Sequence, residues 1–327
     1  MLIRRAEIAG RRLADVHIEG GRITAVADRL QPIRGETVVD ARGGALLPGL
    51  HDHHLHVLAL AAACSSVDCS RSLTGLPLAR PGADGWIRGV RYHEAVAGPL
   101  DRRALDTVRA DVPVRVQHAT GNLWVVNSPG AAALGLPPDH DGRLLGADRW
   151  LRDRLGPQAP PDLGAVGALL ASRGVTGVTD ATFDNGPEEA ALIRAGLPQR
   201  AVVMNCGRAP VKLALHEHEL PELRSFAAKV AEVHAGGRSV AVHAVTRTTL
   251  LFALAAFELA GVRRGDRVEH ASVAPPEAVA TLARLGLTVV TQHNFLVERG
   301  ERYEREVDPD DRPWLYRGRG FLEAGVA

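Results

Sequence analysis

The sequence predicts an α/β protein built on a (β/α)8 barrel of TIM type, with the eighth strand missing. From about residue 165 onward, short β-branched runs alternate with helical stretches, and repeated strand–helix units are typical of a parallel sheet. Single histidines stand near the ends of two successive strands in this region. Because the active site of such a barrel lies at the C-terminal ends of its strands, the same pattern predicts where the site is.

Seven barrel strands are predicted. They cover residues 45–56, 174–181, 200–205, 210–215, 239–245, 267–271 and 287–292. Several of the intervening helices have recognisable ends. Residues 246–260 are followed by Gly261, and a helix that Pro275 and Pro276 open is closed by Gly286. The clear helix ends support the division of this region into strand–helix units.

Two further segments lie outside this pattern. Residues 1–45 contain four apolar-alternating stretches between glycines and predict a short β-meander, which is too small to bury a core alone and needs partner strands. Residues 68–165 are rich in Gly and Pro and contain one good strand candidate, at 114–118. We therefore predict a meander (1–45), a barrel (46–67 and 166–327) and an insertion after the first barrel strand (68–165).

The composition excludes several classes of protein. Of 327 residues, 46% are hydrophobic and 24% are charged, and the net charge of +1 gives no electrostatic reason to expect nucleic acid or an anionic membrane as a partner. No apolar run approaches the length of a membrane span, and the first residues do not resemble a signal peptide. The three cysteines lack zinc spacing and indicate reduced thiols. We expect a cytoplasmic protein with a small-molecule substrate, and leave a homodimer open.

The segment PGLHDHHLH, residues 48–56, contains the strongest motif. Asp52, His54 and His56 are two residues apart, so in a strand they point to one face. Two imidazoles on one face at a strand end can bind one divalent ion, at ~2.0–2.1 Å per nitrogen for zinc. The alternative is a histidine-rich surface turn, which is less favoured because the segment follows an apolar strand run.

Two later histidines stand near strand ends. His243 lies in SVAVHAV and His270 in RVEHAS. At the C-terminal ends of barrel strands they would converge on the site of His54 and His56. Either histidine alone is more often a satisfied core residue, but the combination favours a metal site.

Lys212 lies inside the apolar strand APVKLAL. A buried ammonium is costly, so one interpretation is that the amine loses its proton, takes up carbon dioxide and becomes a carbamate that bridges two metal ions. The other is an edge position from which the amine reaches solvent.

These features resemble the metal-dependent amidohydrolase superfamily, and within it the amidohydrolase-3 type branch that includes N-substituted formamide deformylases. The matching pieces are EGGRITAV, LLPGLHDHHLH, GWIRG, NLWVVNSPGAAALGL, GVTGVTDAT, VAVHAVTR, RVEHASVAPPE and PWLYRGRGFLEAGVA. The resemblance implies a barrel with a small β-sandwich built from both chain ends, of which residues 1–45 would be a part. It also implies a His-x-His pair on strand 1, a carbamylated lysine on strand 4 in many members, histidines on strands 5 and 6, and a catalytic aspartate on strand 8. Counting 174–181 as strand 2 places Lys212 on strand 4, His243 on strand 5 and His270 on strand 6.

The sequence departs from the family pattern at three places. It ends at Ala327, where the family would begin strand 8, so it is interpreted as truncated there and the catalytic aspartate has no counterpart. Asn122 replaces a histidine of many branch members, and His293 replaces a frequent proline. We therefore expect a weakened metal site and low or absent turnover.

The predicted function is metal-dependent hydrolysis of non-peptide C–N bonds in a small molecule by metal-activated water. One or two divalent ions, zinc by default, would be bound by His54, His56, Lys212, His243 and His270, with Asp52 behind them. Candidate substrate-binding residues are His118, Trp124, Asn127, Tyr303 and Arg317, although packing for Trp124 and surface charge for Arg317 are equally open. Two alternatives remain, a mononuclear deaminase-type enzyme with unmodified Lys212 and an inactive truncated remnant.

Overall fold

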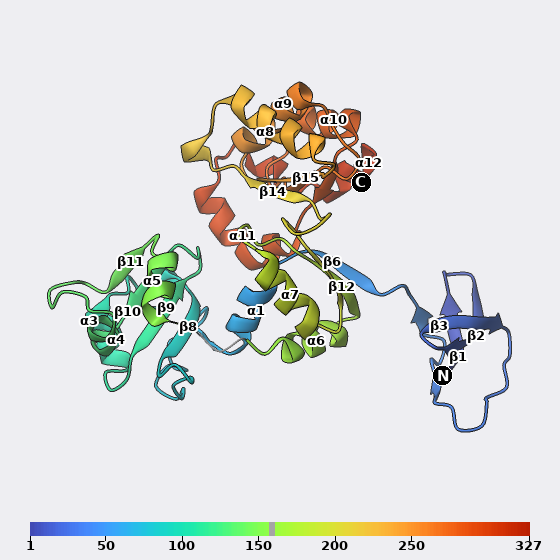
Figure 1. Cartoon of the computed structure of the whole chain (residues 1–327), viewed down its shortest axis with the longest axis horizontal. Helices are drawn as coiled ribbons and strands as arrows, with labels where there is room; N and C mark the ends of the chain where they lie inside the picture. Colours follow the sequence, from blue (N-terminus) through green and yellow to red (C-terminus); the bar gives the residue numbers. More distant parts are fainter. Residues whose placement is uncertain (157–160) are drawn as a thin grey trace. The chain divides into compact units, whose positions relative to one another are not determined.

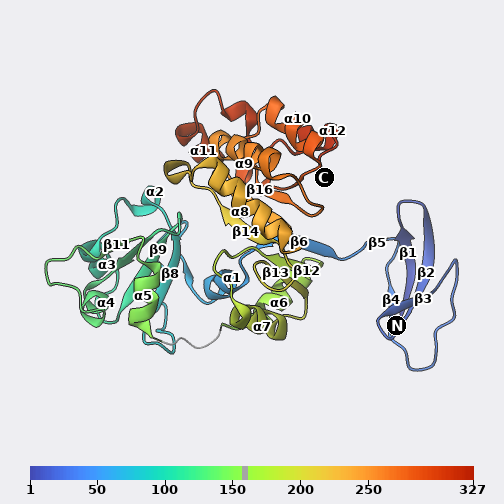
Figure 2. The same ribbon diagram turned by 45° about the horizontal axis from the view of Figure 1, so that its top comes forward.

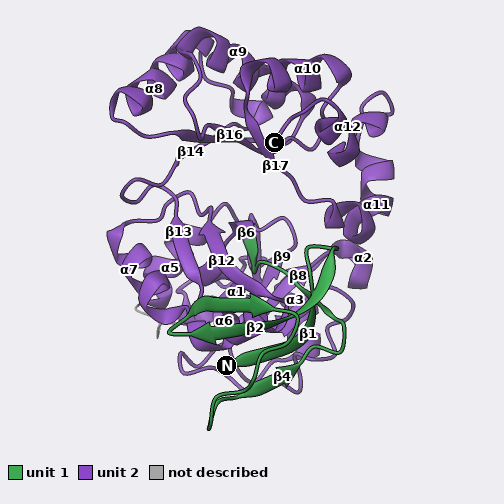
Figure 3. Ribbon diagram, turned by 90° about the vertical axis from the view of Figure 1, so that its right-hand side faces the viewer, with its two compact units in different colours: residues 1–51 green, residues 52–327 purple. Residues whose placement is uncertain are grey.

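The computed structural model describes residues 1–156 and 161–327 and is a mixed α/β structure (Figure 1). The chain divides into two compact units, residues 1–51 and residues 52–327 (Figure 3). The three predicted domains stay a prediction, and each part is described below by itself.

The first unit contains one five-stranded sheet. Its strands are β1 (Leu2–Ile8), β2 (Arg12–Glu19), β3 (Arg22–Ala27), β4 (Val38–Asp40) and β5 (Ala45–Leu46). The first three form an antiparallel meander, as the alternating pattern predicted, but β4 and β5 pair with β1 in parallel. The described residues of this unit contain no second sheet, so the predicted sandwich is not confirmed.

All seven predicted barrel strands are present. They are β6 (Leu50–Leu55), β12 (Val175–Asp180), β13 (Arg200–Val203), β14 (Val211–Ala214), β15 (Val240–Ala244), β16 (Arg267–His270) and β17 (Thr288–Val290). They form two sheets, β13-β12-β6 and β14-β15-β16-β17, in which the order along the chain is kept. Across the part of the chain that the structure describes, no strand ladder joins β13 to β14, and the strands do not close into a barrel.

Helices cover both of these sheets. α8 (Leu223–Ala235), α9 (Arg247–Ala260) and α10 (Pro276–Leu285) lie beside the four-stranded sheet and share one hydrophobic core with it (Figures 1 and 2). α1 (Val57–Cys64), α6 (Leu163–Ser172) and α7 (Pro187–Gly196) share a second core with β12 and β13. The helix ends match the sequence: Thr246 caps α9, and Gly286 ends α10 with a left-handed φ of 67° that favours glycine.

Residues between 67 and 155 form their own α/β structure. A five-stranded sheet has the order β11-β10-β9-β8-β7, with strands at Val67–Asp68 (β7), Ile87–Tyr92 (β8), Val114–His118 (β9), Leu123–Val126 (β10) and Arg143–Leu145 (β11). Its helices are α2 (Glu94–Ala97), α3 (Arg102–Val108), α4 (Ser128–Ala133) and α5 (Asp148–Leu155). The strand predicted at 114–118 is β9. The other strands escaped prediction because they are short or, like IRGVRY in β8, interrupted by glycine and arginine.

The last helices are α11 (Asn294–Glu306) and α12 (Gly318–Glu323). No helix in the described residues is long and apolar enough to cross a membrane. Cys64, Cys69 and Cys206 are free thiols.

Candidate metal centre

Strand register places several predicted ligands on one face of the four-stranded sheet. His243 of β15 pairs with Ala214 of β14 and with Glu269 of β16. Lys212 lies two residues before Ala214, so it faces the same side as His243. Lys212 and His243, which were predicted from their places in two apolar strands, therefore lie on one face of the sheet.

His270 reaches this face by an irregular backbone. A regular strand would turn its side chain away from that of Glu269, the residue before it. Instead, His270 has a φ of 72° and Ala271 a φ of 43°, both in the left-handed region that non-glycine residues rarely adopt. The His270 ring centroid lies 4.6 Å from that of His243 and 4.6 Å from that of His54.

The four histidines, from three strands, form a row of neighbouring rings. His56 follows β6, and its ring centroid lies 5.4 Å from that of His54. From His54 the row continues to His270 and then to His243. The structure thus brings the predicted histidines together, whereas their role as metal ligands stays a prediction.

In three of these rings, Nδ1 forms a hydrogen bond with a neighbouring side chain. The partners are Glu269 for His54, Thr182 Oγ1 at 3.0 Å for His56 and Gln292 Oε1 at 2.7 Å for His270. An imidazole that is held at Nδ1 keeps Nε2 for a metal, which is the usual division of roles in histidine metal sites.

Burial favours the neutral form of three of the four imidazoles. It lowers the pKa of His56 to about 4, of His243 to about 3 and of His270 to about 4, and neighbouring positive groups lower the pKa values further. Neutral imidazole is the form that binds a metal ion. At neutral pH these three rings are therefore ready nitrogen donors.

Lys212 is buried, with 7% of its surface exposed. β14 is an edge strand of its sheet, but the Lys212 amine donates a hydrogen bond to the Ala181 carbonyl instead of reaching solvent. Burial lowers the pKa of this amine. The predicted burial is confirmed, and carbamate formation stays a prediction.

Glu269 belongs to the site and was missed by the sequence analysis. It is fully buried, between the His54 Nδ1 and the Arg267 guanidinium, whose Nε donates to it at 2.5 Å. Burial raises the pKa of Glu269, but the hydrogen bond with His54 and the charge of Arg267 outweigh this and leave the pKa below its usual value. A charged residue inside the strand RVEH was the available signal.

Asp180 is a second residue that was missed. It is fully buried, and its carboxylate accepts hydrogen bonds from Val57 N at 2.6 Å, Thr182 N at 2.9 Å and Asn185 Nδ2 at 2.6 Å. Val57 directly follows His56, so Asp180 fixes the backbone beside a predicted ligand. The signal was an aspartate at the end of the strand in GVTGVTDAT.

Asp52, which was predicted to lie behind the ligands, contacts backbone. Its Oδ1 accepts a hydrogen bond from His54 N at 3.0 Å. It thus supports the main chain at His54, while Glu269 contacts the ring.

The predicted substrate-binding residues have contacts within the fold. Trp124 is buried and donates through Nε1 to Asp148 at 2.8 Å. The side chain of Asn127 is fully buried and bonds four backbone groups, at Arg109, Val112, Val114 and Gly130. These contacts account for both residues without a substrate, and their substrate-binding roles stay a prediction.

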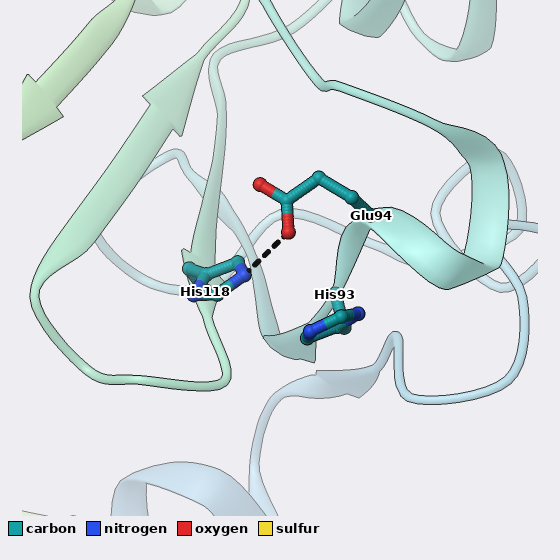
Figure 4. A group of neighbouring side chains, drawn as sticks. All are labelled: His93, Glu94 and His118. Atoms are coloured by element: carbon teal, nitrogen blue, oxygen red, sulfur yellow. Dashed lines mark hydrogen bonds and ion pairs between the residues drawn. The ribbon is translucent and has the colours of Figure 1, made fainter. Parts of the chain in front are cut away.

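The other three candidates lie in two places. The Tyr303 hydroxyl is 2.8 Å from the Tyr316 hydroxyl, and the Arg317 guanidinium lies 5.2 Å from the centre of the Trp314 ring. His118 lies beside Glu94 and His93 (Figure 4). Among the described residues, His93, Glu94 and His118 are the one set of three His, Cys, Asp or Glu side chains whose ligand atoms all lie within 4.8 Å of one another. The four histidines of the row do not meet this distance criterion.

No protein-family model matches the chain, and no curated protein matches it. Solved structures do match. An uncharacterized metal-dependent hydrolase from Pyrococcus horikoshii OT3 is 18% identical with a TM-score of 0.74, over 99% of this chain and 80% of that one. A second uncharacterized metal-dependent hydrolase, from Pyrococcus furiosus, is 19% identical with a TM-score of 0.72, over 99% and 83%.

A weaker match is an atrazine chlorohydrolase from Arthrobacter aurescens TC1, complexed with zinc and atraton. It is 15% identical with a TM-score of 0.51, over 99% of this chain and 70% of that one. At these identities the likeness concerns the fold. The chain therefore has the fold of metal-dependent hydrolases.

Proposed function

We propose that this chain is an amidohydrolase that uses a divalent metal to hydrolyse non-peptide C–N bonds of a small molecule. The observation that carries the proposal is the row of four histidines from β15, β16 and the end of β6, with neighbouring ring centroids 4.6–5.4 Å apart. The fold shared with metal-dependent hydrolases supports it.

The residues present fit a metal. His54 and His56 would bind one ion, and His243 and His270 a second. A carbamate on Lys212 would supply a further anionic oxygen donor to this centre. Zinc is the default because imidazoles suit it. When bound, the metal supplies an acidified water and a Lewis acid for the carbonyl of the substrate.

The chain's own groups prepare this site. Glu269 orients the His54 ring, and burial favours the neutral form of the Lys212 amine. The lone pair of that neutral amine attacks the carbon of carbon dioxide, a nitrogen–carbon bond forms, and the nitrogen releases a proton to solvent. The product is an anionic oxygen donor. No general base is assigned to a residue of this chain.

The mononuclear alternative keeps Lys212 as an amine. Its hydrogen bond to the Ala181 carbonyl favours this reading, because carbamate formation uses the same nitrogen. The number of metal ions bound at the histidine row separates the two alternatives. About two ions per chain support the carbamate, and one ion supports the mononuclear deaminase-type enzyme.

The test combines metal analysis with a screen of N-formyl, N-acyl and cyclic amide substrates. Lys212→Gln should lower the metal content and abolish any hydrolysis seen with the native chain. Lys229→Gln is the matched control, since Lys229 is exposed on α8. An unchanged metal content in Lys212→Gln would refute the carbamate. A folded native chain that takes up no metal at the histidine row would refute the hydrolase proposal itself.

A further inference from the structure

A β-bulge places two potential ligands beside His118. The pairing of β8 with β9 shifts register between Gly89 and Tyr92, and Arg91 has a left-handed φ of 64°. After this shift Tyr92 pairs with His118. The next two residues, His93 and Glu94, therefore arrive at the end of β9. Bulges commonly re-aim side chains in this way.

The three side chains come together at this point (Figure 4). His118 Nε2 lies 2.8 Å from Glu94 Oε2, and the ring centroids of His93 and His118 are 5.4 Å apart. One ligand atom from each residue lies within 4.8 Å of the other two. All three side chains are partly buried, so water still has access.

Backbone and hydroxyl groups orient both imidazoles from outside. Nδ1 of His118 accepts a hydrogen bond from Thr120 N at 3.2 Å and lies 2.8 Å from Thr120 Oγ1. Nδ1 of His93 accepts from Ala95 N at 3.1 Å, at the start of α2. The His118 ring is thus fixed at Nδ1 and directs Nε2 toward Glu94.

We propose that His93, Glu94 and His118 form a binding site for one zinc ion, in addition to the predicted histidine row. Two imidazoles and one carboxylate are a donor set that zinc accepts, and three protein ligands leave the fourth tetrahedral position to water. The carboxylate offsets one of the two positive charges of the ion. Catalytic zinc sites of enzymes share this arrangement of three protein ligands and one open position.

Proton positions define what zinc binding changes. Without metal, the 2.8 Å contact places a proton between His118 Nε2 and Glu94. For zinc to take that place, the ring proton moves to Nδ1, where the Thr120 hydroxyl can accept it, and the hydrogen bond that Thr120 N donates to Nδ1 is lost. Thr120 is therefore a positioning residue of this site. Its loss should weaken zinc binding although all three ligands remain.

The experiment measures zinc stoichiometry and affinity by competition with a chromophoric chelator, with zinc alone as the probe. Glu94→Gln and His118→Gln should each lose one zinc per chain, and Thr120→Val should weaken that zinc by about 10–100-fold. His140→Gln is the control. His140 lies 3.6 Å from Asp141 in the same segment, as a pair without a third ligand, so its zinc binding should match the native chain.

A second background separates this site from the proposed hydrolase centre. A His54→Ala, His270→Ala double variant should keep the Glu94-dependent zinc, whatever becomes of the histidine row. Far-UV circular dichroism checks that each variant folds. If His118→Gln does not fold, Thr120→Val keeps the test decisive. If Glu94→Gln and Thr120→Val both bind zinc with the stoichiometry and affinity of the native chain, the proposal is wrong.

Discussion

At the scale of single residues, Glu269 connects the stability of the fold to the candidate metal centre. Its buried carboxylate contacts the His54 ring on one side and Arg267 on the other, and Arg267 also donates to the His53 carbonyl at 3.1 Å. Arg267 is itself 9% exposed. Removing the charge of Glu269 would leave a buried guanidinium without its partner, which is costly in a protein interior.

Glu269→Gln should therefore have two effects. We expect the free energy of unfolding to fall by about 3 kcal/mol. Metal affinity at the histidine row should fall by about 10–100-fold, because His54 loses the charged acceptor that orients it. Urea denaturation and metal titration measure these effects. Glu277→Gln, an exposed acid at the start of α10, should change neither. Unchanged metal affinity in Glu269→Gln would show that His54 is positioned without it.

The sequence identified the histidines and Lys212 but not their supports. His54 and His56 were recognisable from their spacing, and His243, His270 and Lys212 from their places in apolar strands. Glu269 and Asp180 were not, because their partners are the distant His54 and Val57. Side-chain pairs separated by more than a hundred residues leave no periodic pattern in one sequence. The same limit hid His93 and Glu94, which reach His118 only through a bulge.

At the scale of elements, the ends of α9 show why the barrel helices were predictable. Thr246 Oγ1 accepts from Thr249 N at 3.2 Å, and the Thr249 hydroxyl is 3.0 Å from Thr246 N. Such a reciprocal cap is local, so it can be recognised from neighbouring residues alone. The strands of the insertion depend on distant partners and were mostly missed.

Thr246→Ala should lower the free energy of unfolding by about 1 kcal/mol, because Thr249 N loses its acceptor. Thr248→Ala is the control in the same turn. The Thr248 hydroxyl bonds only the exposed Glu217, so its loss should cost no more than about 0.5 kcal/mol. Thermal or urea unfolding of the two variants checks the difference, and equal losses would argue against the cap.

At the scale of the whole molecule, separate hydrophobic cores underlie the sheets. The insertion sheet has two clusters of its own, whereas the four-stranded sheet and its helices share another. The sequence predicted the barrel strands and their order, since each strand–helix unit repeats a local pattern. It did not predict the open break between β13 and β14, because strand pairing depends on long-range contacts.

Asn127→Ala tests whether these cores are energetically separate. Asn127 satisfies four backbone groups inside the insertion, so its loss should destabilise that segment by about 2–4 kcal/mol. The metal content of the histidine row should not change. Urea unfolding followed by tryptophan fluorescence measures the first effect, since Trp86 and Trp124 lie in the insertion core. Asn294→Ala, on an exposed side chain, is the control. If Asn127→Ala also lowered the metal content of the histidine row, the cores would be energetically coupled.

The carboxylate of Asp180 has a consequence for exchange of amide protons with deuterium. The first N–H groups of a helix have no partner within it and usually exchange freely with solvent. Val57 begins α1, yet its N–H is bound to a fully buried carboxylate of β12. This amide should therefore exchange at the slow rate of cooperative opening of the core around β12, and Asp180→Asn should accelerate it.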